Sequence, residues 1–184
     1  MKKTLWMIAV LVIVGLVSGA GLSITYKYTM PLIEDNKVKE LERSIYTIIP
    51  EMARYERIEK DNLVIYKGIK SDGSTAGYAF TSKGGGYQGD ISMMVGIDEN
   101  LEKLLGLEIL ESVETPGLGG KITNKEFKGQ FKGVSVLKKI EYVKNQKPSK
   151  ANEVEAITGA TVSSNSVVNI LNGGISKARE ILKK

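Results

Sequence analysis

The chain has 184 residues, room for one domain of ordinary size, and a formal net charge of +5. It contains neither cysteine nor histidine. Their absence excludes disulfides, iron–sulfur clusters, thiolate or histidine metal sites, cysteine nucleophiles and Ser-His-Asp triads, and we expect no metal site. The 26 basic and 21 acidic residues nearly balance, which does not indicate nucleic-acid binding. Electron transfer stays possible, because a bound cofactor can carry the electrons.

The first 26 residues have the pattern of a membrane anchor. No charged residue lies between Thr4 and Tyr26. A helix over residues 5–26 would extend about 33 Å, enough to cross a hydrocarbon core of about 30 Å. Trp6 and Tyr26 stand near its two ends, as the aromatic residues of membrane interfaces do. The sequence therefore predicts a single-pass protein of the cytoplasmic membrane.

A cleaved secretory signal is the alternative interpretation of this segment. Lys2 and Lys3 resemble the basic start of a signal peptide, and residues 18–20, Ser-Gly-Ala, resemble a cleavage site. The apolar run continues past that site to Ile24, which favours a retained anchor. Since a short lysine-bearing tail precedes the anchor, we expect the main domain on the extracytoplasmic face.

A second helix is expected over residues 32–49, where helix-forming residues follow Pro31 and end at Pro50. The chain then divides into three parts. They are a cytoplasmic tail with the anchor at 1–26, a connecting helix at 27–50 and a domain at 51–184.

The domain alternates short apolar segments with turns, which is typical of hairpin-linked strands. Strands are expected at residues 63–66, 77–80, 91–97, 104–109 and 134–143. A short helix is expected around 124–131, and an apolar stripe predicts a long one over 163–182. Gly173-Gly174 either breaks this helix or lets a neighbouring backbone pack closely. The fold class is α+β, with a mainly antiparallel sheet and packed helices.

The segment 155–164 carries the most chemical information. A turn containing Gly159 precedes the last helix, and Ser163 and Ser164 are candidate N-caps. The free N–H groups and the positive dipole end of such a helix suit a phosphate. The residues alone leave two interpretations open, a capped helix start or a phosphate site. No Gly-Lys-Ser/Thr follows a glycine loop, so this is not a P-loop.

Residues 158–163, Thr-Gly-Ala-Thr-Val-Ser, resemble the flavin-attachment motif of a family of FMN-binding domains. The family comprises the G subunit of the Rnf ion-translocating electron transport complex and the C subunit of the sodium-translocating NADH:quinone reductase. In this family a flavin transferase uses FAD to join the FMN phosphate covalently to the motif's last threonine, which matches Thr161. The resemblance implies further FMN contacts at Thr158, Gly159, Ala160, Val162 and Ser163.

Residues 114–119 match the family's ETPGLG loop completely, and residues 86–98 resemble its glycine-led strand. The order of anchor, strand, loop, motif and final helix also agrees. The resemblance implies that the loop lies against the flavin ring, through Glu114, Thr115, Gly117, Leu118 and Gly119. Glu114 has two interpretations, an electrostatic influence on the flavin or a cap for neighbouring backbone groups.

A glycine run and one glutamate near these motifs are not expected to bind the flavin. Residues 84–86, three glycines, are expected to form a flexible turn rather than a ligand cradle. Glu155 stands where the family commonly has aspartate, a conservative difference.

The short body resembles the Rnf G subunit more than the longer C subunit. The resemblance implies an electron-transfer flavoprotein with no catalytic residue of its own. Its partners are the membrane subunits of a complex that couples ferredoxin:NAD oxidoreduction to Na⁺ or H⁺ translocation, and the flavin transferase during maturation. The C subunit is the rival within the family. A membrane-anchored binding protein without flavin is the rival from another class, and flavin fluorescence on a denaturing gel distinguishes it.

Overall fold

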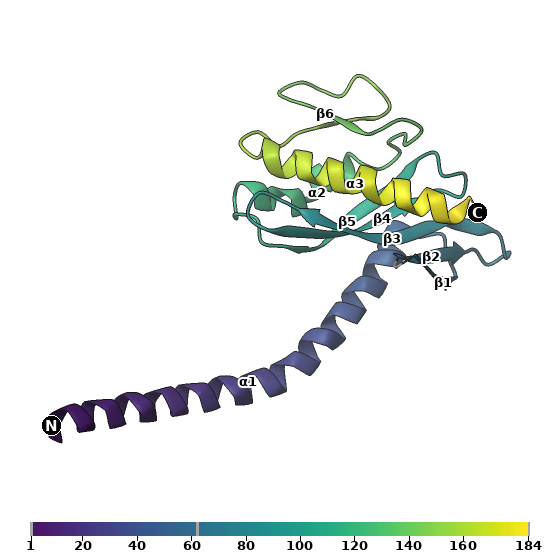
Figure 1. The fold of residues 1–184 in the computed structure, drawn as a ribbon. Helices are drawn as coiled ribbons and strands as arrows, with labels where there is room; N and C mark the ends of the chain where they lie inside the picture. Colours follow the sequence, from purple (N-terminus) through teal and green to yellow (C-terminus); the bar gives the residue numbers. More distant parts are fainter. Residues whose placement is uncertain (1, 62, 184) are drawn as a thin grey trace. The chain divides into compact units, whose positions relative to one another are not determined.

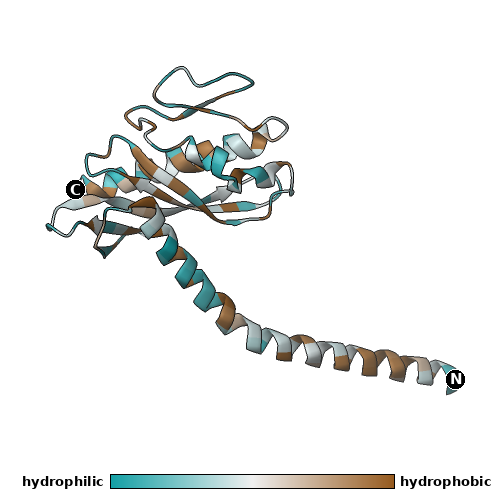
Figure 2. Ribbon diagram, turned by 180° about the vertical axis from the view of Figure 1, so that it is seen from behind, coloured by the Kyte–Doolittle hydropathy of each residue, from teal (hydrophilic) through white to brown (hydrophobic). Residues whose placement is uncertain are grey.

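The computed structural model describes residues 2–61 and 63–183, which form two compact units divided after Glu40. The first unit is helical. Helix α1 (Lys2–Ile48) begins in it and ends in the second unit. The N-terminal part of α1 is apolar and its side chains are exposed, and the helix is long and apolar enough to cross a membrane (Figure 2).

One continuous helix stands where two were expected, because α1 runs through Pro31 without interruption. Proline has no N–H, so the hydrogen bond to the carbonyl of Lys27 is missing, and the ring crowds that carbonyl. The turns on either side keep their own bonds and hold the helix together.

The second unit contains a five-stranded sheet in the order β1-β2-β3-β4-β5, antiparallel throughout, which confirms the expected architecture. Its strands are β1 (Arg54–Lys60), β2 (Leu63–Ile69), β3 (Thr75–Gly85), β4 (Asp90–Ile97) and β5 (Leu104–Ser112). Strand β1 was not among the expected strands. Its residues, Arg-Tyr-Glu-Arg-Ile-Glu-Lys, are mostly charged and exposed, as is common for a strand at the edge of a sheet.

Both faces of the sheet are covered in its centre. Successive side chains of a strand point to opposite faces. Met93 and Val95 of β4 join the cluster packed under helix α3 (Thr161–Leu182), whereas Met94 joins the cluster with Ile45 and Ile48 at the end of α1. Figure 1 shows α3 lying along one face of the sheet. This packing fixes the start of α3 relative to the strands.

Helix α3 runs unbroken through Gly173 and Gly174. A Cβ on Gly174 would lie 2.5 Å from Ser82 Oγ and 3.0 Å from Phe80 Cε2, so the helix backbone packs directly on β3. The close-packing interpretation of the glycine pair is therefore confirmed at Gly174. Gly173 is exposed and has open space around it.

The glycines at 84–86 do not form the expected flexible turn. Gly84 and Gly85 end β3. A Cβ on Gly84 would overlap Ile170 of α3, and one on Gly86 would overlap Glu114. Close packing explains these two glycines better than flexibility does.

The prediction of a strand over residues 134–143 is wrong except for its last three residues. Only β6 (Glu141–Val143) is a strand, and it pairs in parallel with β7 (Glu153–Glu155). The preceding residues hydrogen bond to separate loops, Ser135 to Ala151 and Val136 to Glu102. In Figure 1 the β6 segment lies beside α3, to which the amide of Asn172 links it by two bonds with Ile140. Two short helices, η1 (Gly119–Thr123) and α2 (Lys125–Gly129), complete the domain.

Candidate functional site

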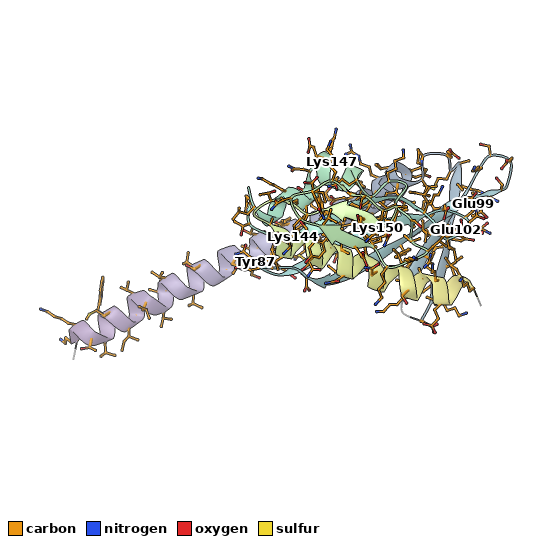
Figure 3. The ribbon with its side chains drawn as sticks, turned by 90° about the horizontal axis from the view of Figure 1, so that it is seen from above. Tyr87, Glu99, Glu102, Lys144, Lys147 and Lys150 are labelled. Atoms are coloured by element: carbon orange, nitrogen blue, oxygen red, sulfur yellow. The ribbon has the colours of Figure 1, made fainter. Side chains whose placement is uncertain are left out.

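A tight turn leads from β7 into α3. The N–H of Ala160 donates to the carbonyl of Ile157 at 2.9 Å, and Gly159 has φ +81°. That conformation favours glycine, because a Cβ makes left-handed backbone unfavourable. The helix begins at Thr161. Thr161 is half-buried, and Val162 beside it is 54% exposed. The turn therefore leaves the first residues of α3 partly exposed, and Figure 3 looks onto the face of the sheet that α3 covers.

Ser163 and Ser164 are not the N-caps that the sequence suggested, because α3 begins two residues earlier. Ala160 occupies the cap position, and no side chain caps this end. Ser164 Oγ instead donates to the carbonyl of Ala160 and accepts from the N–H of Ile157, both at 3.0 Å. Both serines are buried. The first N–H groups of α3 remain available to an external acceptor.

The hydroxyl of Thr161 differs from its neighbours. Ser163 and Ser164 both use their hydroxyls within the protein, and Thr158 Oγ1 donates to Asn145 Oδ1 at 3.4 Å. Within residues 2–61 and 63–183, Thr161 Oγ1 has no hydrogen-bond partner. A free hydroxyl at an uncapped helix start can carry a phosphate group, whose charge the helix dipole stabilises.

The loop at 114–120 lies next to the turn that precedes α3. It turns at Thr115, whose carbonyl accepts from the N–H groups of Leu118 and Gly120, with Gly117 at φ +78°. Leu118 is 52% exposed, and its Cδ2 would lie 3.9 Å from a Cβ on Gly159. An exposed leucine beside the turn offers an apolar surface to a planar ring.

Glu114 lies deep in the site, with 7% of its surface exposed. Its Oε1 accepts from the backbone N–H groups of Tyr87 at 2.6 Å and Gln88 at 3.0 Å. Its Oε2 accepts from Ser163 Oγ at 2.6 Å. Cβ atoms on Gly86 or Gly119 would overlap the carboxylate oxygens. These bonds confirm that Glu114 caps neighbouring backbone groups, and its electrostatic influence on the flavin stays a prediction.

The predicted site residues mostly converge. The turn at 158–163 is continuous, Leu118 lies by Gly159, and Glu114 and Gly119 lie by Ser163. Thr115 and Gly117 shape the loop, and Thr115 Oγ1 bonds to Gln88 Oε1 at 2.9 Å. Four further residues of this neighbourhood were not predicted as site residues, namely Gly86, Tyr87, Gln88 and Asn145. Only the resemblance at 86–98 pointed toward the first three.

Two hollows adjoin the site. A groove of about 890 Å³ is lined by Thr158 together with Lys121, Lys147, Glu126 and Glu155. A second hollow of about 500 Å³ adjoins it at Lys121 and includes Glu114. Both volumes fall in the range of ligand pockets. The two lysines of the groove are offset by two glutamates, so the helix start is the stronger attraction for a phosphate.

Glu114 is ionised at neutral pH. Burial raises the pKa of its carboxyl, but the hydrogen bonds from Ser163, Gln88 and Tyr87 outweigh burial and bring the pKa below its ordinary value. A lowered pKa in the folded state stabilises the protein above the ordinary pKa of about 4.5. That contribution is lost as the pH falls through the lowered pKa.

We therefore predict that Glu114 makes folding stability fall in acid. The free energy of unfolding of the wild-type full chain, measured by urea titration in detergent from pH 7 downward, should exceed that of Glu114→Gln at pH 7. The difference should shrink only once the pH falls below about 4.5, since the carboxylate then becomes protonated. A difference that stays constant across this range would contradict the assignment.

Comparison with known proteins agrees with this geometry. Residues 86–176 match the sequence model of the FMN-binding domain. This range includes the 114–120 loop and the turn before α3. The chain is thus a protein with an FMN-binding domain and a helix long enough to cross a membrane.

The relatives specify the family. The chain is 31% identical to the G subunit of the ion-translocating oxidoreductase complex of Methanosarcina acetivorans, covering 95% of this chain and 94% of the relative. It is 28% identical to the G subunit of the Na⁺-translocating ferredoxin:NAD⁺ oxidoreductase complex of Acetobacterium woodii, covering 95% and 91%. The chain belongs to the family of G subunits of ion-translocating oxidoreductase complexes.

Solved structures show the same fold. NqrC of Shewanella oneidensis matches with a TM-score of 0.58 at 21% identity, over 65% of this chain and 62% of that one. The C subunit of the Na⁺-translocating NADH-quinone reductase of Parabacteroides distasonis matches with a TM-score of 0.57 at 24% identity, over 66% and 69%.

Proposed function

We propose that this chain is the flavoprotein subunit of a membrane ferredoxin:NAD oxidoreductase complex, in which it relays electrons through covalently bound FMN. Two relatives that match over most of their length are named as G subunits of such a complex. We also propose that the complex translocates Na⁺ or H⁺, because the names of the same relatives include these ions. The observation that carries the proposal is the free hydroxyl of Thr161 at an uncapped helix start, beside Leu118 of the 114–120 loop.

The attachment is a group transfer to Thr161. Thr161 Oγ1 forms a bond to the phosphorus of the flavin half of FAD, and the bond between that phosphorus and the bridging oxygen of FAD breaks. Adenosine monophosphate leaves with the bridging oxygen, and the hydroxyl proton is lost to a base of the flavin transferase. The phosphodiester keeps one negative charge, which the N–H groups and dipole of α3 stabilise.

The chain's own residues fit the cofactor by shape and by charge. Gly159 lets the turn approach a bound phosphate closely, and Leu118 and Val162 provide exposed apolar surface for a ring. FMN supplies one-electron chemistry, and the protein supplies position and electrostatics. The chain therefore acts only within its complex, with the other membrane subunits as its partners.

The C subunit of the sodium-translocating NADH:quinone reductase is the weaker assignment. Its solved structures share the fold at less than 25% identity over about two thirds of this chain. Three G subunits match over more than nine tenths of it. Length and sequence together favour the G subunit.

The test of this proposal is flavin on the denatured protein. The chain is produced with its transferase, denatured and run on a gel, and its intact mass is measured. We expect a fluorescent band and a mass increased by FMN less one water. A dark band of unmodified mass would support the rival, a membrane-anchored binding protein without flavin.

We further propose that residues 5–26 form a retained anchor and that the main domain faces the outside of the cytoplasmic membrane. Lys2 and Lys3, which precede the apolar run, support this orientation. Protease added to intact spheroplasts of the producing cells should digest the domain, while a cytoplasmic control protein survives. Digestion only after lysis would reverse the orientation, and release of the domain into the medium would indicate a cleaved signal.

A further inference from the structure

Glu114 connects three segments that are distant in sequence. It belongs to the 114–120 loop, bonds the backbone of Tyr87 and Gln88, and bonds Ser163 in the first turn of α3. Each of the three segments also presents an exposed apolar side chain, namely Tyr87, Leu118 and Val162. One carboxylate thus holds together the segments whose exposed side chains are available to a ligand.

The carboxylate of Glu114 satisfies all three donors. Three groups donate to it, and an ionised carboxylate accepts with both oxygens. A glutamine amide would keep one acceptor oxygen for the two backbone N–H groups, and its NH₂ group would donate a neutral bond to the hydroxyl of Ser163. Gly86 and Gly119 close on the two oxygens so tightly that a Cβ at either would overlap them. The carboxylate is therefore held in one position.

We propose that Glu114 is a positioning residue for flavin attachment, which fixes the first turn of α3 through Ser163 and thereby orients the hydroxyl of Thr161. The inference rests on the proposed function. Ser163 and Thr161 stand two residues apart in the same turn, so they point to different sides of the helix. Ser163 faces inward to Glu114. Thr161, with its unbonded hydroxyl, is left to face the incoming phosphate.

Fixing the turn matters because group transfer needs the nucleophile in one orientation. The first turn of a helix frays readily, and here no side chain caps it. The bond from Ser163 to a buried, ionised carboxylate is charge-assisted and is stronger than a neutral one. Without it, Thr161 would sample orientations that do not meet the phosphorus.

The experiment measures attachment directly. The full chain is purified in detergent without flavin and incubated with flavin transferase and FAD, and the initial rate of in-gel fluorescence is recorded. The variants are Ser163→Ala, Glu114→Gln and the two combined. The control is Gly174→Ala, which we expect to destabilise the helix packing without touching the site. Urea titration shows how much each variant is destabilised.

We expect Ser163→Ala to slow attachment about tenfold, as loss of a hydrogen bond to a charged group implies. Glu114→Gln should slow it less, because the amide keeps a neutral bond to Ser163. The double variant should be no slower than the slower single variant, because both weaken the same interaction. Gly174→Ala should load at the wild-type rate despite its lower stability. If Glu114→Gln fails to fold, the attachment rate of Ser163→Ala alone tests the inference. That substitution removes a single oxygen atom and should disturb the fold less.

Two results would overturn the inference. Loading of Ser163→Ala and Glu114→Gln at the wild-type rate would show that the bond does not orient Thr161. Slowing of Gly174→Ala in proportion to its stability would show a merely structural effect. A wild-type chain that never gains flavin would instead contradict the proposed function itself.

Discussion

Replacing Thr161 with alanine is expected to leave a folded chain that carries no covalent flavin. The substitution removes the only atom at this position that can form the ester, and alanine is fully compatible with a helix start. Thr161 opens α3, and its hydroxyl has no partner among the described residues. The denatured band should therefore lose its fluorescence to background. The intact mass should equal that of the unmodified chain.

Two matched variants decide which hydroxyl is used. Thr161→Ser keeps a hydroxyl at the same place and should retain fluorescence. Thr158→Ala removes the hydroxyl three residues earlier, which already donates to Asn145, and should also stay fluorescent. A fluorescent Thr161→Ala together with a dark Thr158→Ala would move the attachment to Thr158. In complexes that contain Thr161→Ala, ferredoxin-dependent NAD reduction should fall with the flavin content.

The fold was predictable where the pattern is local. Short apolar segments at 91–97 and 104–109 marked β4 and β5, and the stripe from Val167 to Leu182 marked α3. Strand β1 has no such pattern, because a charged edge strand buries little. Strands β6 and β7 have three residues each and exist only because they pair with each other. Neither the charged edge strand β1 nor the pairing of β6 with β7 can be recognised from a short stretch of sequence.

The site was predictable in its residues but not in its bonds. The two motifs, at 114–119 and 158–163, identified the segments that form the site. The sequence placed Ser163 as a helix cap, whereas it bonds Glu114, 49 residues away. Gly86 is a glycine because the carboxylate of Glu114, from another segment, fills the space beside it, and Gly119 lies equally close to the hydroxyl of Ser163. Such pairings depend on the tertiary fold, which no local pattern encodes.

The glycine pair in α3 supplies a prediction with a built-in control. Gly174→Ala is expected to lower the free energy of unfolding by about 2 kcal/mol, the usual cost of forcing a group into a packed interior. The new Cβ would lie 2.5 Å from Ser82 Oγ and 2.8 Å from Ser82 Cβ. Ser82 cannot move freely, because its hydroxyl donates to the carbonyl of Ile170 at 3.0 Å. Phe80 on the same strand is fully buried and closes the other side.

Gly173→Ala is the matched control, since it makes the same chemical change one residue earlier. A Cβ there meets nothing within 4 Å. Alanine should raise stability by about 1 kcal/mol through its higher helix propensity. Urea titration of the full chain in detergent measures both changes. Ser82→Gly should relieve part of the cost of Gly174→Ala, because the two side chains would compete for one space. Equal effects at positions 173 and 174 would mean that α3 does not pack on β3 through Gly174.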